Sequence, residues 1–242
     1  MPKKHIESIL LKLLAVEYLK LLKRRFTYDE LSKRLSLPAP VLNRYIRGYV
    51  LPRDERAKQI IEFAEQHINL EKELLSRIQF DERGYFDNTK IIYDVVLLKL
   101  IINKKILKFA KWKINKVMTA AVDGLPLATL VASELGVNLV FAKREKEVGV
   151  KSFLEEVYVP RDSGITVSLY IPRNSIRPRE KVLIVDDVIR TGETQRALIN
   201  LVSKAKGAVA GIFVLIAIGD AWRRRIPKNI PVDYFVKIEP PR

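Results

Sequence analysis

The sequence predicts a chain with two parts, an all-α N-terminal domain and an α/β domain that contains a mostly parallel sheet. Three observations support this prediction. Apolar residues recur at helical spacing through about the first 67 residues, strands alternate with helices from about residue 85 onward, and 48% hydrophobic residues in a chain of 242 suffice for two modest cores. We expect a helical domain at residues 1–67, a linker at 68–85 and a second domain at 86–242.

The charge balance of the chain favours an anionic partner. Lys and Arg number 44 against 28 Asp and Glu, which gives a formal net charge of +16. Nucleic acid, phosphorylated metabolites and membrane surfaces are the partner classes that such a charge attracts. Thermophilic surfaces are also rich in Lys, Arg and Glu, but they usually balance the two signs and therefore explain this excess less well.

Composition excludes several classes of protein. Because the chain has no cysteine, it cannot form a disulfide scaffold, a Cys-ligated zinc site or a thiol nucleophile, and its two histidines argue against a histidine-rich metal site. The longest uncharged run, residues 207–219, is shorter than the roughly 20 residues of a membrane-spanning helix. We therefore expect a soluble, cytoplasmic protein with no membrane partner, no metal site and no required cofactor.

Short helices follow one another in the N-terminal part. Thr27 and Glu30 have the spacing of a capping box, in which each side chain accepts a hydrogen bond from an otherwise unpaired amide at the start of a helix. Pro40 suits the first turn of the next helix, and Gly48 is a natural C-terminal stop. The expected helices end near residue 25, span 27–35 and 40–48, and occupy 55–76.

The helix expected at 40–48 follows a short turn at 36–38, which is the arrangement of a helix–turn–helix. Docked on the preceding helix by an apolar face, it would present its polar face to the major groove of DNA, where Asn pairs with adenine and Arg with guanine. A helical interaction module with a solvated basic face is the alternative. The apolar face consists of Val41, Leu42, Tyr45 and Ile46, and the candidate DNA-binding residues are Asn43, Arg44 and Arg47.

The segment from Thr27 to Pro52 resembles the lambda-repressor-like and winged helix–turn–helix regulators. The resemblance is carried by Thr27-Tyr-Asp-Glu-Leu-Ser-Lys-Arg-Leu and by the stretch from Asn43 to Pro52, which is similar to the end of the recognition helix in those proteins. It implies a winged or simple helix–turn–helix domain whose partner is double-stranded DNA.

From about residue 85 the pattern changes to alternating strands and helices, which is typical of a parallel sheet covered on both faces. Such sheets bind ligands just past the carboxyl ends of their strands, where residues 118–123 and 185–194 are expected to lie. Strands are expected near 115–118, 138–142, 156–159, 165–171, 181–185, 210–218 and 233–238, and helices near 88–109, 125–135 and 193–205.

The most informative stretch runs from Val182 to Thr194. Four apolar residues predict a buried strand, Asp186 and Asp187 follow where it ends, and a small-residue loop then opens a helix. The amides of this helix start suit a phosphate dianion, which Gly192 allows to approach closely, and the two carboxylates suit ribose hydroxyls. A Walker B strand is the competing interpretation, but the chain lacks the G-x-x-x-x-G-K-S/T loop of P-loop NTPases.

This stretch resembles the motif with which type I phosphoribosyltransferases bind phosphoribosyl pyrophosphate (PRPP). A second segment, Ala120-Ala-Val-Asp-Gly-Leu-Pro-Leu-Ala128, is similar to their pyrophosphate loop, although these residues alone also fit an ordinary strand-to-helix turn. Together the two segments imply a phosphoribosyltransferase-like domain. The ligand-binding residues that the resemblance implies are Asp186 and Asp187 for the ribose, Ile189, Arg190, Thr191, Gly192, Glu193 and Thr194 for the 5′-phosphate, and Ala121, Val122, Asp123 and Gly124 for the pyrophosphate.

Residues 141–149 resemble the beginning of the mobile catalytic loop of orotate phosphoribosyltransferases. Lys143 and Arg144 match its leading basic pair, but Lys146 matches the later catalytic lysine only after a one-residue deletion, and Val148 stands where those enzymes carry histidine. Transfer needs cations for the departing pyrophosphate and a group that manages the substrate's proton. We therefore assign no catalytic residue, and the three cations are either ligand contacts or a solvated charge run.

A helix–turn–helix joined to a phosphoribosyltransferase-like domain resembles the archaeal GfcR-type transcriptional regulators, which are related to orotate phosphoribosyltransferase. The resemblance implies DNA-binding control of genes of central sugar metabolism. From the two motifs together we expect a homodimer, and the expected effector is PRPP or another phosphorylated ribose or nucleotide. Mg²⁺ is expected only together with bound PRPP. The alternatives are an active phosphoribosyltransferase that transfers ribose 5-phosphate from PRPP to a nucleobase, and an RNA-binding attenuator, against which the recognition-helix pattern argues.

Overall fold

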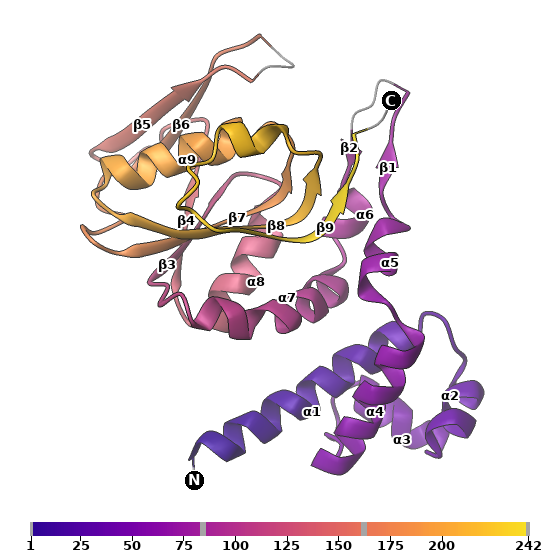
Figure 1. Cartoon of the computed structure of the whole chain (residues 1–242). Helices are drawn as coiled ribbons and strands as arrows, with labels where there is room; N and C mark the ends of the chain where they lie inside the picture. The colour runs from indigo at the N-terminus through magenta and orange to yellow at the C-terminus, as the bar shows by residue number, and fades with distance from the viewer. Residues whose placement is uncertain (1, 83–85, 161–163, 241–242) are drawn as a thin grey trace. The chain divides into compact units, whose positions relative to one another are not determined.

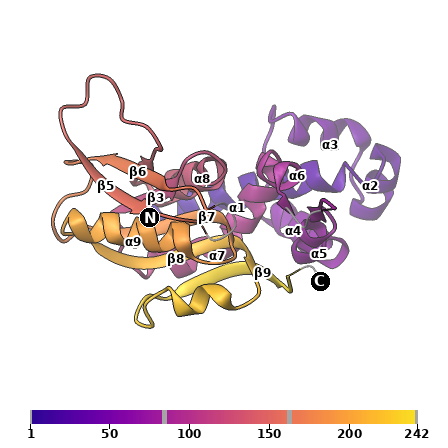
Figure 2. The same ribbon diagram turned by 90° about the horizontal axis from the view of Figure 1, so that it is seen from above.

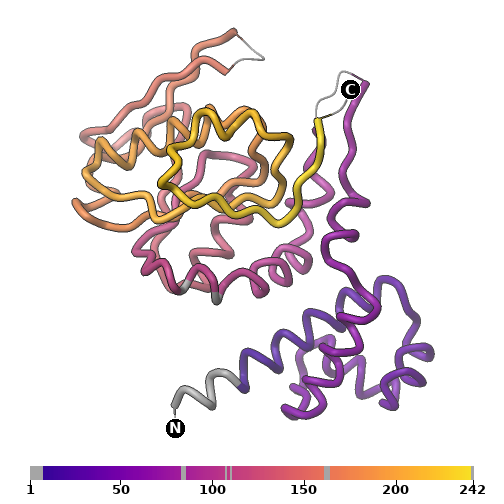
Figure 3. The backbone as a smooth tube through the Cα atoms, in the orientation of Figure 1, coloured from indigo at the N-terminus to yellow at the C-terminus, as the bar shows by residue number. Residues whose placement is uncertain are grey.

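The computed structural model describes residues 2–82, 86–160 and 164–240, apart from the side chains of residues 2–7, 107 and 110. Its backbone is traced in Figure 3. Contacts divide the chain into two compact units, which we call the helical unit (Met1–Arg77 with Asp94–Asn103) and the α/β unit (Ile78–Tyr93 with Lys104–Arg242). The backbone therefore passes from one unit to the other more than once. The boundary expected at 68–85 stays a prediction about which parts fold independently.

The helical unit contains the expected succession of short helices. They are α1 (Pro2–Leu22), α2 (Tyr28–Leu35), α3 (Ala39–Ile46), α4 (Asp54–His67) and α5 (Leu70–Leu75). The capping box at the start of α2 is confirmed, because the Thr27 hydroxyl accepts a hydrogen bond from the Glu30 amide while the Glu30 carboxylate accepts one from the Thr27 amide at 2.7 Å. Fully buried Leu31 and Leu42 lie on α2 and α3, which pack against each other.

The single helix expected at 55–76 is wrong, since α4 and α5 are separate helices. After α4 the backbone of Ile68 is extended, with φ −122° and ψ 111°, and the Asn69 side chain accepts a hydrogen bond from the Lys72 amide at 3.0 Å. An N-cap asparagine satisfies an unpaired amide at a helix start, and so it favours a new helix over continuation of the old one. Ile68 is buried, which holds the break in place.

The helix expected at 88–109 is likewise two helices, α6 (Thr89–Ile92) and α7 (Val95–Ala110). Asp94 stands between them, and its carboxylate accepts a hydrogen bond from the Leu97 amide at 3.1 Å. The same carboxylate forms ion pairs with Arg24 and Arg77 within the helical unit. Asp94 thus caps α7 and ties its first turn to two other segments, which apolar spacing alone does not reveal.

A five-stranded sheet forms the centre of the α/β unit. Its strands are β3 (Lys116–Ala120), β4 (Asn138–Ala142), β7 (Lys181–Ile189), β8 (Ala208–Ile218) and β9 (Val232–Ile238). They are ordered β4–β3–β7–β8–β9, and every neighbouring pair is parallel, which confirms the expected class of fold (Figure 1). The helices α8 (Leu125–Leu135) and α9 (Glu193–Lys204) cover opposite faces of the sheet. Burial on both faces explains the continuous apolar runs of β7 and β8.

Two further strands, β5 (Phe153–Tyr158) and β6 (Val167–Pro172), form an antiparallel hairpin outside this sheet. The hairpin lies beside α9 (Figures 1 and 2). Glu156 of β5 is one polar anchor to α9, because its carboxylate pairs with Lys204 Nζ at 2.7 Å and accepts a hydrogen bond from Asn200 Nδ2 at 2.6 Å. These contacts fix the position of the hairpin relative to α9.

The remaining regular elements are short. They are β1 (Gln79–Phe80), β2 (Phe86–Asp87) and the 3₁₀-helix η1 (Ala221–Arg224). Within the described part of the chain, no helix combines the length and the apolar character that a membrane span requires.

Candidate functional site

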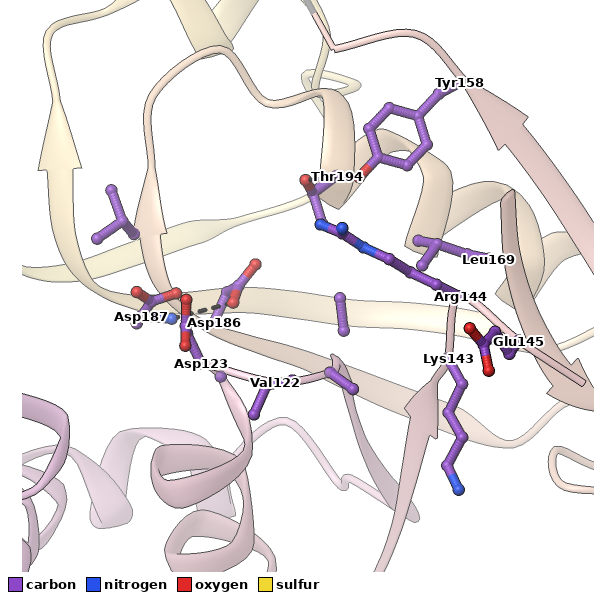
Figure 4. Close-up of a pocket in the computed structure, with 14 residues that line it drawn as sticks. Val122, Asp123, Lys143, Arg144, Glu145, Tyr158, Leu169, Asp186, Asp187 and Thr194 are labelled. Carbon is purple, nitrogen blue, oxygen red and sulfur yellow. Dashed lines mark hydrogen bonds between the residues drawn. The ribbon is translucent and has the colours of Figure 1, made fainter. Parts of the chain in front are cut away.

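A cavity of about 590 Å³ opens at the carboxyl ends of β3, β4 and β7 (Figure 4). These strands are neighbours in the sheet and run in the same direction, so the residues that follow each of them meet at one edge. The structure therefore brings together segments that lie far apart in the sequence. We call this space the strand-end cavity. Its lining includes Ala121, Val122, Asp123, Gly124, Lys143, Arg144, Asp186, Asp187 and Thr194.

Asp186 and Asp187 line the strand-end cavity at the end of β7. Asp186 is buried, and its carboxylate accepts hydrogen bonds from Gln195 Nε2 at 2.8 Å and from the Asp187 amide at 3.1 Å. Burial, together with the neighbouring charge of Asp187, raises the pKa of Asp186 well above its usual value. Burial also raises the pKa of Asp187, to which the charge of Asp123 adds. Two acids held out of water in this way are strong acceptors for ligand hydroxyls.

Two partners of the carboxylate pair were not identified from the sequence. Asn88, which precedes α6, donates a hydrogen bond from Nδ2 to Asp187 across 99 residues of sequence. Gln195, in the first turn of α9, donates to Asp186 and also to the carbonyl of Val188 at 3.2 Å. Gln195 directly follows the motif and could have been suspected from its position, whereas nothing in the sequence points to Asn88.

The loop after β3 packs tightly against the carboxylate pair. A Cβ atom added at Gly124 would lie 2.2 Å from Thr119 Oγ1 and 2.7 Å from Asp186 Oδ1, so only glycine fits at this point. The Ala121 amide donates to the carbonyl of Ala142 at 2.9 Å, and the peptide bond between Ala121 and Val122 is cis. The segment resembling a pyrophosphate loop is thus anchored to both neighbouring strands, β4 and β7.

The loop between β7 and α9 contributes less to the cavity than the motif implies. Thr194 lines the cavity, but Ile189, Arg190, Thr191, Gly192 and Glu193 are not among its lining residues. Ile189 is fully buried in the core, and Arg190 is exposed. Gly192 has φ +80° and lies against Trp222, whose Cβ would be 3.1 Å from an added side-chain carbon.

The carboxylate of Glu193 accepts a hydrogen bond within the loop between β7 and α9. The Thr191 hydroxyl donates a hydrogen bond to Glu193 Oε2 at 3.1 Å, and Arg225 Nη2 lies 2.7 Å from Glu193 Oε1. Arg225 Nη1 also donates to the carbonyl of Thr191 at 3.1 Å. Glu193 therefore uses a hydroxyl that the resemblance assigns to a phosphate, and Arg225, from the end of η1, is a further residue that contacts the loop.

The three cations that follow β4 separate in the structure. Arg144 points across the strand-end cavity toward Thr194, whereas Lys143 points away from the carboxylates (Figure 4). Lys143 pairs with Glu147. Lys146 is not among the lining residues and lies over the ring of Tyr170, 4.9 Å from its centroid. Of these three residues, Arg144 is the best placed to meet an anionic ligand.

The β5–β6 hairpin supplies two cavity residues that the sequence did not indicate. Leu169 and Tyr158 line the cavity, and the Tyr158 hydroxyl is 3.2 Å from Thr194 Oγ1. Within the described residues, no group of three His, Asp or Glu side chains is arranged to hold a metal ion.

The candidate DNA-binding residues lie at the end of α3 in the helical unit. Arg44 and Arg47 are exposed, and Asn43 is half-buried. Asn43 Oδ1 accepts hydrogen bonds from the Tyr28 hydroxyl at 3.0 Å and from Arg47 Nε at 3.2 Å. The expected apolar face is present, with Leu42 fully buried and Val41, Tyr45 and Ile46 half-buried.

The parallel sheet and the paired carboxylates at the end of β7 define an α/β domain of the type I phosphoribosyltransferase class. The family model of the phosphoribosyl transferase domain matches residues 88–239, more than half of the chain, and the chain belongs to this family. The expectation from the PRPP-binding motif is thereby confirmed for the fold.

Relatives of this chain include transcriptional regulators. The purine biosynthesis transcriptional repressor PurR of Bacillus subtilis is 35% identical over 108 residues, which cover 45% of this chain and 38% of that protein. The probable purine biosynthesis transcriptional regulator PurR of Streptococcus pneumoniae is 31% identical over 132 residues, which cover 54% of this chain and 48% of that protein. The chain thus spans less than half the length of these regulators.

Enzymes of the family are also similar. Xanthine phosphoribosyltransferase of Bacillus cereus is 28% identical over 151 residues, which cover 60% of this chain and 75% of the enzyme. The crystal structure of adenine phosphoribosyltransferase from Rhodothermus marinus superposes with a TM-score of 0.62 and 29% identity, and the match covers 70% of this chain and 98% of that one.

Proposed function

We propose that this protein is a transcriptional regulator that binds double-stranded DNA through α3 and senses PRPP, or a related phosphorylated ribose or nucleotide, in the strand-end cavity. One observation carries the proposal: a single chain contains two short packed helices, α2 and α3, with exposed Arg44 and Arg47, and a phosphoribosyl transferase domain with a buried carboxylate pair. The similarity to the PurR regulators supports it.

The geometry suggests how the effector binds. Asp186 and Asp187 accept hydrogen bonds from the ribose hydroxyls, Arg144 faces the phosphate groups, and the amides of residues 121–124 border the pyrophosphate. Mg²⁺, where it takes part, enters as the companion of PRPP, because this ion is usually held by substrate phosphates together with one or two carboxylates.

The active form we propose is a homodimer. Two copies of α3 then meet half-sites about one helical turn apart, roughly 34 Å, in the manner of helix–turn–helix dimers. An effector changes DNA affinity only if it binds differently to two arrangements of the dimer. The resemblance of Thr27–Pro52 and Asp186–Ala197 to GfcR-type regulators further suggests operators at genes of central sugar metabolism.

The test is a titration of the full chain onto labelled duplex fragments of its own genome, with and without PRPP, at two salt concentrations. We expect saturable, sequence-dependent binding that PRPP shifts. Arg44→Ala and Arg47→Ala weaken DNA binding and leave PRPP binding intact, whereas the double change Asp186→Asn with Asp187→Asn abolishes the PRPP response and leaves DNA binding intact. Weak binding that ignores sequence and collapses with salt would refute the regulator.

A second candidate function is phosphoribosyl transfer, which the match over 75% of a xanthine phosphoribosyltransferase favours. It predicts release of pyrophosphate when the protein is mixed with PRPP, Mg²⁺ and a nucleobase such as xanthine or adenine. The missing histidine at Val148 and the position of Lys146 outside the cavity argue for the regulator. Pyrophosphate release that depends on the base and disappears in Asp186→Asn would establish the enzyme.

A further inference from the structure

The polar end of α3 is held in one arrangement by the preceding helix. α3 packs against α2 and α1, Leu42 of α3 is fully buried, and Asn43, which follows it, is half-buried. Tyr28, the first residue of α2, donates a hydrogen bond from its hydroxyl to Asn43 Oδ1. Lys23 Nζ lies over the ring of Tyr28, 4.8 Å from the ring centroid. The side chain of Asn43 is therefore constrained by the first residue of α2.

The amide oxygen of Asn43 already has two donors. Arg47 Nε lies 3.2 Å from it, and because a guanidinium can only donate, the atom that faces Arg47 is the oxygen of the amide. The Tyr28 hydroxyl, 3.0 Å from the same oxygen, must then donate as well. A carbonyl oxygen accepts through two lone pairs, and both are in use. Only the Nδ2 hydrogens of Asn43 are left to contact a ligand.

Because both lone pairs of the Asn43 oxygen are in use, Asn43 cannot pair with adenine in the way that the sequence predicts. An asparagine pairs with adenine in the major groove by accepting from N6 and donating to N7 at the same time. The acceptor half of that pair is unavailable on α3. The groups that α3 presents are the Asn43 amide hydrogens and the guanidinium hydrogens of Arg44 and Arg47, and all of them are donors.

We infer that α3 reads guanine and not adenine, with Asn43 and Tyr28 acting as positioning residues for Arg47. Guanine is the base whose major-groove edge offers two adjacent acceptors, O6 and N7, and a guanidinium donates to both at once. The hydrogen bond from Nε to Asn43 orients the Arg47 side chain and leaves its two terminal nitrogens to meet that edge. This inference rests on the proposed binding of double-stranded DNA.

The first test uses base analogues. A preferred duplex is selected by the full chain from a randomised library, and each guanine is then replaced by 7-deazaguanine, which lacks N7, and each adenine by purine, which lacks the N6 amino group. We expect 7-deazaguanine at one or two positions of each half-site to weaken binding about tenfold or more, and purine at any adenine to change it less than about twofold. A loss with purine that equals the loss with 7-deazaguanine would overturn the inference.

The second test separates positioning from base contact by substitution. Asn43→Ala and Tyr28→Phe should lower the discrimination against 7-deazaguanine by about threefold or more, because Arg47 loses its support. Asn43→Asp should keep this discrimination, since a carboxylate also accepts from both Tyr28 and Arg47. Loss of discrimination in Asn43→Asp equal to that in Asn43→Ala would contradict the positioning role. Tyr93→Phe, an exposed tyrosine of the α/β unit, is the matched control.

The selection step distinguishes this inference from the proposed function. If the library yields no enriched sequence, and scrambled duplexes bind equally well, the DNA-binding regulator fails and the inference fails with it. If a sequence is enriched but its contacts require the adenine amino group, the regulator stands and the guanine readout alone is refuted.

Discussion

The two adjacent carboxylates of the strand-end cavity make the fold less stable at neutral pH. Their pKa values are raised in the folded protein, chiefly by burial, so the folded state favours the protonated acids. The stabilisation of the folded state by the protonated acids is fully present below the usual carboxyl pKa, near 3.8. It is lost as the pH rises through the raised pKa values. A ligand that donates hydrogen bonds to both acids would recover part of this loss.

The substitution Asp187→Asn should therefore stabilise the protein at neutral pH. The carbonyl oxygen of the introduced amide can still accept from Asn88, while the charge is gone. We expect the free energy of unfolding at pH 7.5 to rise by about 1 kcal/mol, with the gain shrinking as the pH falls toward about 4, and thermal unfolding across this range measures it. Asp220→Asn is the control, because the pKa of that exposed carboxyl is lowered by Lys237 and Arg223. An unchanged melting temperature in Asp187→Asn at every pH would contradict the prediction.

Glu193 should weaken the binding of phosphate in the loop between β7 and α9. Its carboxylate accepts the hydrogen bond of the Thr191 hydroxyl and repels an incoming dianion, although the positive charge of Arg225 offsets part of the negative charge. We expect Glu193→Gln to lower the dissociation constant for PRPP about threefold to tenfold, as measured by calorimetry, the size of one screened charge contact. Glu145→Gln, at the β4 side of the cavity, controls for a general change of charge. Weaker binding in Glu193→Gln would instead indicate that the carboxylate supports the loop.

Among the elements, the β5–β6 hairpin is a separate wall of the cavity whose position depends on α9. Tyr158 and Leu169 line the cavity, and the hairpin is not part of the five-stranded sheet, although Tyr170 of β6 exchanges two backbone hydrogen bonds with Lys143, which directly follows β4. Its polar anchoring to α9 includes Glu156, whose pKa is lowered because the hydrogen bonds from Lys204 and Asn200 outweigh the effect of burial, and the Glu155 carbonyl, which accepts from Lys204 Nζ. This anchor and the backbone hydrogen bonds between Tyr170 and Lys143 together position the hairpin that carries Tyr158.

Loosening that anchor should affect ligand binding more than stability. Glu156→Ala removes both contacts to α9, and we expect PRPP affinity to fall about threefold to tenfold while the melting temperature changes by only a few degrees. Glu155→Ala is the matched control, since Glu155 on the same strand bonds to Ser168 and Tyr170 inside the hairpin. Equal losses of affinity in the two variants would show that the hairpin itself, and not its anchor, matters.

For the whole molecule, the formal net charge of +16 predicts a strong dependence of DNA binding on salt. Each phosphate neutralised by the protein contributes a slope of about −0.9 to a plot of log affinity against log salt. We expect a slope of several units for both preferred and scrambled duplexes, with the preferred duplex bound more tightly at every salt concentration. Fluorescence anisotropy over a series of salt concentrations measures this, and a flat plot would show that the charge serves another purpose.

The same salt series separates residues that contact phosphate from residues that read a base. A residue that contacts phosphate lowers the slope by about one unit when it is replaced, whereas a residue that reads a base lowers the preference for the selected sequence. We expect Arg47→Ala to reduce the preference and to leave the slope nearly unchanged if, as proposed, Arg47 reads a guanine while its Nε is held by Asn43.

Short-range patterns in the sequence were enough to predict the capping box at Thr27, the alternation of strands and helices and the motif around Asp186, because each depends on residues that are neighbours in the chain. The same reasoning missed both helix breaks, at Ile68 and at Asp94, where a polar cap overrides continuous apolar spacing. It also pointed to an adenine contact for Asn43, whose oxygen accepts hydrogen bonds from Tyr28 and Arg47 in the structure.

The contacts that shape the two candidate sites come from packing between distant segments. Asn88 donates a hydrogen bond to Asp187, 99 residues further along the chain, and Tyr158 contacts Thr194, 36 residues further along. Glu193 forms an ion pair with Arg225, at the end of η1. No local pattern encodes such pairs, since their distances depend on how strands align in the sheet and how helices pack on it. The chain's sequence therefore determined the class of domain and the position of its motif, whereas the tertiary structure decided which side chains face a ligand and which are already occupied by one another.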